Sequence, residues 1–570
     1  MSITFQPVVR AQSVKYKGAA LVGTYSVIIG WDLKDPSNRI GLKGFAIRRS
    51  ELNPITEEVT ELRWLRGYKR FKSDDSDHGE EVSSLEAPFQ RFRWNDYSLK
   101  PENAYRFEVF EMRGDPGALV RSHKAISFLI RPSREDQDDL GIYVNRGVTA
   151  ASAYLSRFKN KAPKEVGAAA YNWLSRGLKE SLLEFIESTE NDEALHIAIY
   201  EFHDPEVAQA VRDAVDRGVT VQMVHDAKPG KHSTEKNEKM IHDFQLEEIS
   251  FPRTNVNISH NKVVIRLSNN VPKAVWTGSA NFSENAFNFQ TNTALVIRDP
   301  QVAVNYEAFF QGMKDNPLKK DSKIINLNLV TQANVLQDRF AEKTFFSPVR
   351  KKDLLVTARE LVSSAKSIVM VSAPFGLDKT IIESLGQNSG KIIEYGLVNA
   401  TAKRKIEKLH RKNTRFFTPS RLKTYMGKNW DAKAFGAHKI HAKSIVVDPW
   451  GDDPKVLIGS ANFSNASCSD NDENALLIVG NKRLASIIAS EFMRMYDHYK
   501  SRYYIDRFNK KNEEIEKENK QRVLNGLEPK PLRVMDVFLK EDEEWSRTSF
   551  DPNTSSHKFQ DRIIFAGAES

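Results

Sequence analysis

Two stretches of the chain carry the same polar residues at the same spacing. SHNKVVIRLSNNVPKAVWTGSANFS, residues 259–283, returns as KIHAKSIVVDPWGDDPKVLIGSANFS, residues 439–464. In each copy a His-x-Lys pair is followed, 18 residues after the histidine, by GSANFS, and both elements recur at an offset of 181 residues. A constant offset over so long a distance indicates the internal duplication of a domain-sized unit.

The residue types in the two copies suit the cleavage of a phosphodiester. Without a metal, that reaction needs a nucleophile, an acid for the leaving oxygen and fixed positive charge for the phosphoryl oxygens. Two histidines, two lysines and two asparagines that meet across a pseudo-two-fold interface supply all three. The candidate residues are His260, Lys262 and Asn281 in the first copy and His441, Lys443 and Asn462 in the second.

The repeated HxK and GSxN motifs resemble those of the phospholipase D superfamily, whose full signature is HxKxxxxD followed by GSxN. The second copy has Asp448 at the aspartate position, whereas Leu267 stands there in the first copy. Downstream, Asn471 and Glu473 match a family NxE element that supports an active-site histidine, and the first copy has Gln290 and Asn292 at those places. The resemblance covers roughly residues 140–505.

The resemblance implies a role for each residue. His260 is expected to be the nucleophile that forms a phosphohistidine, and His441 the acid that protonates the leaving group and then activates water. Glu473 is expected to orient one of the two histidines. The remaining candidates are expected to bind or support the phosphate: Lys262, Lys443, Asn281, Asn462, Ser279, Ser460 and Asp448. We expect no metal and no cofactor.

The substrate is a phosphodiester of nucleic acid or of lipid, because the family includes nucleases, tyrosyl-DNA phosphodiesterases, phospholipases and phospholipid synthases. Residues 403–433 contain eleven Lys or Arg and two acidic residues, with four aromatic residues among them. A groove for a phosphate backbone needs this composition, although a solvated helix and loop would also explain it. The residues expected to bind nucleic acid are Lys403, Arg404, Arg411, Lys412, Arg415, Arg421, Lys423 and Lys428.

We therefore favour a nuclease acting on DNA or RNA. One alternative is a phospholipase D or a phospholipid-transferring enzyme, since the same basic segment suits an anionic membrane surface. A second alternative is a catalytically degenerate protein that binds nucleic acid or serves as a scaffold.

The elements that must position these residues differ between the two parts of the chain. Residues 1–134 have short alternating strands broken by turns, and Leu99 and Tyr105 in LKPENAYRFEVF resemble the tyrosine corner of a fibronectin type III-like β-sandwich. From about residue 141 the pattern predicts a helix over 168–188, then a strand, a helix and a strand, which means parallel pairing in a covered sheet. Each HxK motif is expected to lie in a strand. Alternate side chains of a strand point to the same face, so the histidine and the lysine of each motif should point the same way.

The predicted fold class is α/β, with two phospholipase D-like α/β/α halves related by a pseudo-two-fold and preceded by an all-β sandwich. The expected divisions are the sandwich at 1–134, the halves at 140–330 and 331–505, and a charged helix and tail packing back at 506–570. Two motifs in one chain make a monomer sufficient for a complete site. The sandwich is expected to position the rest or bind a protein partner.

The composition describes ordinary soluble globular material. The net charge is +9, there is one cysteine, and nowhere do about 18 apolar residues follow one another. These features predict a cytoplasmic protein.

Overall fold

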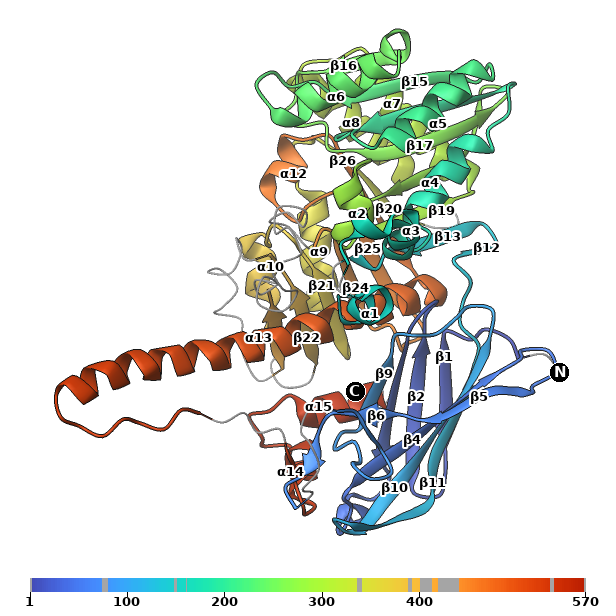
Figure 1. The fold of residues 1–570 in the computed structure, drawn as a ribbon. Helices are drawn as coiled ribbons and strands as arrows, with labels where there is room; N and C mark the ends of the chain where they lie inside the picture. The colour runs from blue at the N-terminus through green and yellow to red at the C-terminus, as the bar shows by residue number, and fades with distance from the viewer. Residues whose placement is uncertain are drawn as a thin grey trace.

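The computed structural model describes residues 3–73, 80–147, 151–159, 161–335, 341–387, 392–399, 413–418, 440–533 and 538–567. Figure 1 shows a β-sandwich formed by the N-terminal part of the chain, and two α/β regions that follow it. None of the described helices combines the length and hydrophobicity needed to cross a membrane.

The N-terminal part is a sandwich of two four-stranded sheets, as predicted. One sheet has the order β1-β2-β3-β9 and the other β11-β10-β4-β5. The Tyr105 hydroxyl accepts a hydrogen bond from the Lys100 amide at 2.8 Å, so the predicted tyrosine corner is present. The strands are β1 Val8–Gln12, β2 Tyr16–Val22, β3 Val27–Leu33, β4 Gly44–Leu52, β5 Val59–Trp64, β9 Arg93–Asp96, β10 Ala104–Asp115 and β11 Ala118–Ile130.

The two α/β regions repeat one sheet topology. The first sheet has the order β12-β13-β19-β18-β17-β14-β15-β16, and the second has β20-β26-β25-β24-β21-β22-β23. Apart from β12 at the edge, each strand of one sheet has a counterpart at the same place in the other. The duplication inferred from the motifs therefore extends over a whole seven-stranded unit.

The strand bounds of the first sheet are β12 Asp136–Gln137, β13 Leu140–Val144, β14 Glu193–Ile199, β15 Thr220–Asp226, β16 Ser250–Arg253, β17 Lys262–Ser268, β18 Val271–Gly278 and β19 Thr293–Ile297. Those of the second are β20 Lys343–Ser347, β21 Ile368–Ser372, β22 Ile393–Leu397, β23 Thr414–Phe417, β24 Ser444–Val447, β25 Lys455–Gly459 and β26 Glu473–Val479. The predicted parallel pairing holds for β14 with β15 and for β21 with β22.

The helices cover both sheets. In the first half they are α1 Ala151–Phe158, α2 Pro163–Val166, α3 Ala168–Ser175, α4 Leu178–Glu187, α5 Pro205–Asp216, α6 His232–Asp243, α7 Pro300–Lys314 and α8 Lys319–Val335. In the rest of the chain they are α9 Asp353–Ser363, α10 Lys379–Ser384, α12 Asn465–Ser469, α13 Lys482–Leu524, α14 Glu544–Phe550 and α15 Lys558–Phe565.

The single helix predicted over 168–188 is wrong, because the structure divides it into α3 and α4. Arg176 and Gly177 both have positive φ, 49° and 81°, and end the first helix in a left-handed turn. A glycine adopts this conformation at no steric cost, and the helical spacing of the apolar residues on either side hides the break.

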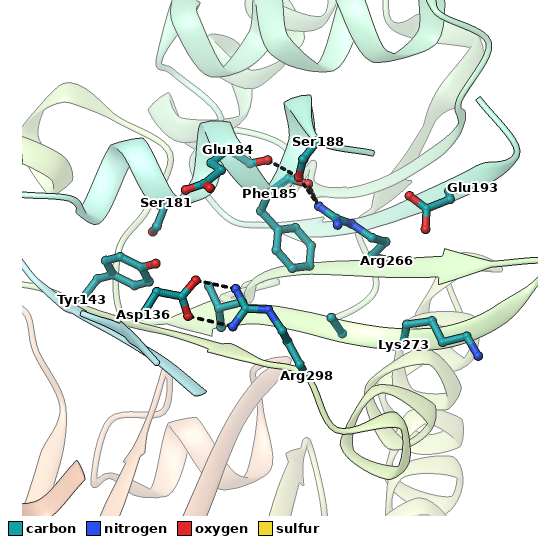
Figure 2. Close-up of a pocket in the computed structure, with 12 residues that line it drawn as sticks. Asp136, Tyr143, Ser181, Glu184, Phe185, Ser188, Glu193, Arg266, Lys273 and Arg298 are labelled. Carbon is teal, nitrogen blue, oxygen red and sulfur yellow. Dashed lines mark hydrogen bonds and ion pairs between the residues drawn. The ribbon is translucent and has the colours of Figure 1, made fainter. Parts of the chain in front are cut away.

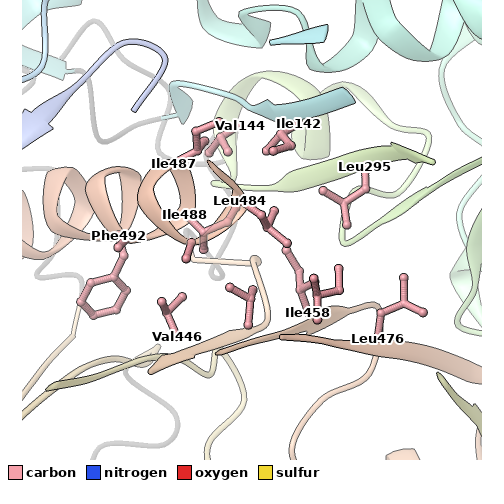
Figure 3. Close-up of a cluster of buried hydrophobic side chains, with 14 of the residues drawn as sticks. Ile142, Val144, Leu295, Val446, Ile458, Leu476, Leu484, Ile487, Ile488 and Phe492 are labelled. Atoms are coloured by element: carbon pink, nitrogen blue, oxygen red, sulfur yellow. The ribbon is translucent and has the colours of Figure 1, made fainter. Parts of the chain in front are cut away.

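The two sheets meet through a shared apolar core. Figure 3 shows Leu484, Ile487 and Ile488 of α13 lying between Val144 of the first sheet and Val446 of the second, all of them buried. The corresponding helix of the first half, α7, contributes Tyr306, Phe309, Phe310 and Met313 to the same core. Packing of both helices into one core holds the two halves, and so the two motifs, in a fixed relation.

The C-terminal part of the chain returns to the sandwich. Helix α13 continues past residue 505 to Leu524 and, in Figure 1, extends away from the body of the protein. Helices α14 and α15 then pack on the sandwich, where the Trp545 indole donates to the Leu42 carbonyl at 2.8 Å and Arg562 pairs with Asp32.

Candidate active site

Each histidine precedes a strand and is held by the opposite half. His260 lies just before β17 and His441 just before β24, so the expectation that each whole HxK pair sits within a strand is wrong. The His260 amide donates to the Asp472 carbonyl at 2.8 Å, and the His441 amide donates to the Thr291 carbonyl at 3.0 Å. Because residues 291 and 472 are also 181 apart, the two halves exchange equivalent contacts.

A polar side chain at the end of a parallel strand fixes the backbone before each histidine. Asp226, the last residue of β15, accepts from the Ser259 amide at 2.7 Å. Asn399, just beyond β22, donates to the Ile440 carbonyl at 2.9 Å and accepts from its amide at 3.3 Å. Both histidine loops are thus tied to the carboxyl edge of their own sheet.

His260 faces a carboxylate. Its Nδ1 lies 3.2 Å from Oε2 of Glu473, which belongs to the second half. The other oxygen of Glu473 accepts from the Ser467 hydroxyl and the Asn471 amide, each at 2.8 Å. Burial acts to raise the pKa of Glu473, but His260 and these donors outweigh it and hold the pKa below its usual value. Glu473 is therefore a fixed, ionised partner for His260.

His441 faces neutral oxygens at the equivalent place. Its Nδ1 lies 2.9 Å from Oδ1 of Asn292 and 2.9 Å from the Ser279 carbonyl. The Asn292 amide nitrogen donates to the Ala286 carbonyl at 2.9 Å, which turns Oδ1 toward the histidine. Since these two partners of Nδ1 are acceptors, Nδ1 carries the proton in the neutral ring, and Nε2 is left as an acceptor that faces the Lys443 amine.

The two lysines are buried with the histidines. Lys262 donates to the His260 carbonyl at 2.6 Å, and the Lys443 amine lies 3.2 Å from both ring nitrogens of His441. Burial lowers the pKa of Lys262 to about 7, although Glu473 and Glu201 act to raise it. The pKa of Lys443 is lowered further below its ordinary value by burial and by Lys262.

The two histidines and the two lysines form one cluster, because they lie close enough to lower one another's pKa values. Burial and Lys262 lower the pKa of His260 to about 4, although Glu473 acts to raise it. Burial, Lys443, Lys262 and His260 together lower the pKa of His441 well below its ordinary value. In the free protein both rings are therefore neutral at pH 7.

The asparagines and serines of GSANFS complete the cluster. The Asn281 amide donates to Glu201 at 2.7 Å, and the Asn462 backbone amide lies 3.2 Å from Glu473. The hydroxyls of the two serines form hydrogen bonds with asparagines that lie behind the histidines. Ser279 donates to Asn292 at 2.8 Å, and the Ser460 hydroxyl accepts from the Asn474 amide at 3.0 Å. The serines thus position the residues behind the histidines.

Asp448 lies at the opposite end of β24 from Lys443. Its carboxylate accepts from the backbone amides of residues 366–368 and from the Ser367 hydroxyl, at 2.7–3.0 Å. It therefore ties the start of β21 to the end of β24. Leu267, at the equivalent place of the first half, is buried in the apolar core, so this difference between the copies does not touch either histidine.

Three residues near the cluster were not predicted from the sequence. Glu201 accepts from Asn281, the Tyr200 ring lies 5.1 Å from that of His260, and the Phe375 ring lies 6.1 Å from that of His441. All three follow β14 or β21 at the carboxyl edge of the sheet. That edge is where parallel strands place functional residues, and this is the signal that could have identified them.

A cavity of about 780 Å³ opens beside His260. Tyr200 and Glu201 line it, and they connect it to His260 and Asn281. Of its eleven lining residues, nine are polar or charged: Glu201, His203, Lys231, His232, Ser233, Lys236, Ser283, Glu284 and Asn285.

A smaller pocket of about 290 Å³ lies elsewhere in the first half and contains none of the candidate residues. Figure 2 shows Arg298 joined to Asp136 by two hydrogen bonds, of 2.7 and 2.6 Å, and Arg266 directed to Ser188. Both guanidinium groups that line this pocket are thus already paired with protein groups.

The basic segment expected to bind nucleic acid falls largely outside the described residues. Lys403, Arg404, Arg411, Lys412, Arg421, Lys423 and Lys428 lie there. Arg415 is in β23 and is half-buried. Strand β23 pairs with β22 in parallel.

The comparison with protein families agrees with this geometry. Residues 182–314 and 358–496 each match the family described as cardiolipin synthase, phospholipase D-like domain. No curated protein matches the chain.

Solved structures also match. Polyphosphate kinase from Porphyromonas gingivalis is 13% identical over 54% of this chain and 46% of its own length, with a TM-score of 0.37. Phosphatidylserine synthase from Haemophilus influenzae is 11% identical over 57% of this chain and 85% of its own, with a TM-score of 0.43. Nuc, a phospholipase D family member from Salmonella typhimurium, is 26% identical over 24% of this chain and 87% of its own, with a TM-score of 0.21.

The family matches contain both HxK motifs and both GSANFS motifs, and the structure brings the two sets together in one cluster. The chain therefore carries two domains of the phospholipase D superfamily, one in each half.

Proposed function

We propose that this protein is a nuclease that hydrolyses phosphodiester bonds of DNA or RNA through a phosphohistidine, without a metal. The observation that carries the nucleic-acid assignment is the polar cavity beside His260. A phosphate backbone and its sugars need hydrogen-bonding and cationic groups, which this cavity offers in Lys231, Lys236 and His232.

A lipid substrate would need a different lining. Burial of acyl chains requires apolar surface, because their transfer from water is the main source of binding energy. Among the residues that line this cavity, only Phe289 and the ring of Tyr200 are apolar. On the other side of the cluster, Phe375 is 43% exposed beside His441, where a base can stack on it.

In the proposed first step, Nε2 of His260 attacks phosphorus and the bond from phosphorus to the leaving oxygen breaks. His441 gives its proton to that oxygen, while Lys262, Lys443, Asn281 and Asn462 bind the phosphoryl oxygens. The imidazole on phosphorus then carries a positive charge, and Glu473 at 3.2 Å from its Nδ1 stabilises that charge.

In the second step, His441 takes a proton from water as the water oxygen attacks phosphorus. The nitrogen–phosphorus bond breaks, which releases a phosphomonoester and restores neutral His260. The same group acts first as acid and then as base: His441 takes up a proton from solvent when the substrate binds, gives it to the leaving oxygen, and regains one from water.

Substrate binding is what prepares His441 to act as an acid. In the free protein its pKa is held low by burial and by Lys443, Lys262 and His260. A phosphodiester anion placed among these cations offsets their repulsion and so raises the pKa of His441. His441 therefore becomes a proton donor when a phosphodiester occupies the site.

The test is an assay of the purified full chain in excess EDTA on labelled single- and double-stranded DNA and RNA, alongside vesicles of phosphatidylcholine and phosphatidylglycerol. We expect cleavage of nucleic acid by the wild type and by His242→Ala, which removes an exposed histidine far from the motifs in sequence. His260→Ala should abolish that cleavage.

Turnover of lipid without cleavage of nucleic acid would overturn the nuclease assignment while leaving the phosphodiesterase chemistry in place. Cleavage of nucleic acid that EDTA abolishes and manganese restores would overturn the metal-independent mechanism.

A further inference from the structure

A second large cavity, of about 800 Å³, lies where three distant parts of the chain meet. It is lined by residues 87–93 of the sandwich, by the middle of α13, and by α14 and α15. Figure 1 shows α14 and α15 on the same side of α13 as the sandwich. The candidate catalytic residues do not line this cavity, and neither do Tyr200, Glu201 and Phe375 beside them, so it is separate from the active site.

The lining of this cavity is strongly cationic. It contains eight lysines and arginines and three acidic residues, an excess of five positive charges before His557 is counted. Arg91, Lys500 and Lys558 come from the sandwich, α13 and α15, respectively, and no ion pair joins any of them to a carboxylate of the described residues. Three cations from three elements therefore converge on one space.

Two of the acidic groups in the cavity are already engaged. Asp497 accepts from the Tyr97 hydroxyl at 2.8 Å and is paired with Arg93 at 3.4 Å. Asp561 lies 2.7 Å from the His557 ring and accepts from the Tyr395 hydroxyl. These carboxylates therefore link the elements that line the cavity.

Each of these three cations lies near other cations of the lining. Arg91 and Lys558 are exposed and Lys500 is half-buried. Arg93 lies near both Arg91 and Lys500, and Lys69 lies near Lys558. Like charges repel one another, and a bound anion offsets that repulsion.

The size and the remaining lining indicate what kind of anion fits. A volume of about 800 Å³ is well above what a single phosphate needs and lies within the usual range for sites that bind small molecules. Tyr68 and Tyr504 also line the cavity and are 67% and 46% exposed, so part of each ring is accessible to a planar group.

We propose that this cavity binds a nucleotide, with Arg91, Lys500 and Lys558 contacting its phosphates and Tyr68 or Tyr504 its base. The nucleotide comes either free in solution, as a nucleoside triphosphate, or as part of a polynucleotide chain. Phosphate oxygens accept several charge-assisted hydrogen bonds at once, and a base supplies the planar surface that the tyrosines match. This site does not depend on the activity of the histidine cluster.

The experiment is isothermal titration calorimetry of the full chain in EDTA with four probes: ATP, inorganic tripolyphosphate, a short single-stranded oligonucleotide and polyglutamate. To keep the oligonucleotide intact, each protein also carries His260→Ala, so that any binding at the histidine cluster is the same in every variant. The cavity variant is Lys500→Gln with Lys558→Gln. The matched control is Lys517→Gln with Lys520→Gln, which removes two exposed lysines from the outer part of α13.

We expect ATP or the oligonucleotide to bind, and the cavity variant to weaken that binding about tenfold or more while the control leaves it unchanged. Binding of ATP identifies a free nucleotide as the ligand, and binding of the oligonucleotide alone identifies a polynucleotide. Binding of neither probe, equal loss in both variants, or polyglutamate bound as tightly as the nucleotide would overturn the proposal. So would tripolyphosphate bound as tightly as ATP, because the tyrosines would then contribute nothing.

Thermal unfolding separates a binding defect from misfolding. Without a probe, the cavity variant should unfold at a temperature equal to or above that of the wild type, because Lys500 is repelled by Arg93 and Arg91, and Lys558 by Lys69 and Arg91. The nucleotide should raise the unfolding temperature of the parent protein but not of the cavity variant. A cavity variant that unfolds several degrees earlier would instead show that the lysines hold the structure together, and would contradict the proposed role.

Discussion

The two histidine sites have the same backbone frame and differ in the group that faces each histidine ring. His260 and His441 precede equivalent strands, and each is hydrogen-bonded through its amide to the opposite half. Behind His260 stands the carboxylate of Glu473, whereas the equivalent residue behind His441 is Asn292, an amide. A carboxylate stabilises a positively charged imidazole, and an amide oxygen only fixes the ring orientation.

This difference teaches how a duplicated site acquires two roles. The residue that is suited to carry phosphorus, and with it a positive charge, is the one that faces Glu473. The residue that is suited to release its proton is the one without a charged partner. We therefore infer the order of attack from positions 292 and 473 rather than from the histidines themselves.

The largest expected effect comes from removal of either histidine. His260→Ala and His441→Ala should each lower kcat by at least about ten-thousand-fold on nucleic acid, since the nucleophile or the leaving-group acid is lost. On a bis(p-nitrophenyl) phosphate substrate, whose leaving group needs no proton, His441→Ala should retain a rapid burst of p-nitrophenolate. A burst from His260→Ala would reverse the assignment.

Removal of the carboxylate should come next in size. Glu473→Gln keeps the shape of the side chain and removes the charge that stabilises phosphorylated His260, so we expect kcat to fall about 10- to 100-fold. Steady-state kinetics on the same substrate measure it. A variant whose KM rises while its kcat stays constant would show that Glu473 acts only in binding.

Anion binding should depend on pH because of the lysine beside His260. The pKa of Lys262 is lowered to about 7, and a bound anion favours its protonated form. Binding therefore takes up a proton, and the affinity for vanadate should fall as pH rises above 7, by up to about tenfold per unit. Titration calorimetry in two buffers of different ionisation enthalpy measures the proton uptake. Lys262→Met should lower it to the uptake that remains at His441, and an affinity that is constant between pH 6 and 9 in the wild type would contradict the account.

Conversion of the second site toward the first should have a smaller effect. Asn292→Asp places a carboxylate next to His441 and raises its pKa, so the proton needed for the leaving group is retained to higher pH. We expect the alkaline limb of the kcat profile to move upward by about one unit. Asn269→Asp, in an exposed turn, is the control and should leave the profile unchanged.

The smallest effect on activity is expected from a change of Asp448, which stands where the first copy has Leu267. Asp448→Asn weakens the bonds to residues 366–368 and should lower the thermal unfolding midpoint of the second half by a few degrees. The kcat of the folded variant should stay within about twofold of the wild type. A drop in kcat with no change in stability would place Asp448 in the catalytic machinery.

The sequence predicts those parts of the fold whose signal is local or repeated. Alternating strands and the corner around Tyr105 identified the sandwich, and the 181-residue offset identified two equivalent halves. The helix break at Arg176 and Gly177 was missed, since the apolar spacing continues on both sides of it.

The pairing of partners across the interface could not be predicted from the sequence. The family resemblance implies that Glu473 supports a histidine, but the choice of His260 depends on how the two sheets pack through α7 and α13. For the same reason Glu201 and Phe375 escaped notice, because neither belongs to a motif and each reaches the cluster only through the topology of its sheet.

The most direct test of the account is to locate the covalent intermediate. Wild type and His441→Ala would be mixed with bis(p-nitrophenyl) phosphate, quenched at alkaline pH where phosphohistidine survives, digested and mapped by mass spectrometry. The account predicts phosphorus on His260 in both proteins and a longer-lived adduct in His441→Ala, because the base for the second step is missing. Phosphorus on His441 in the wild type, with none on His260, would contradict it.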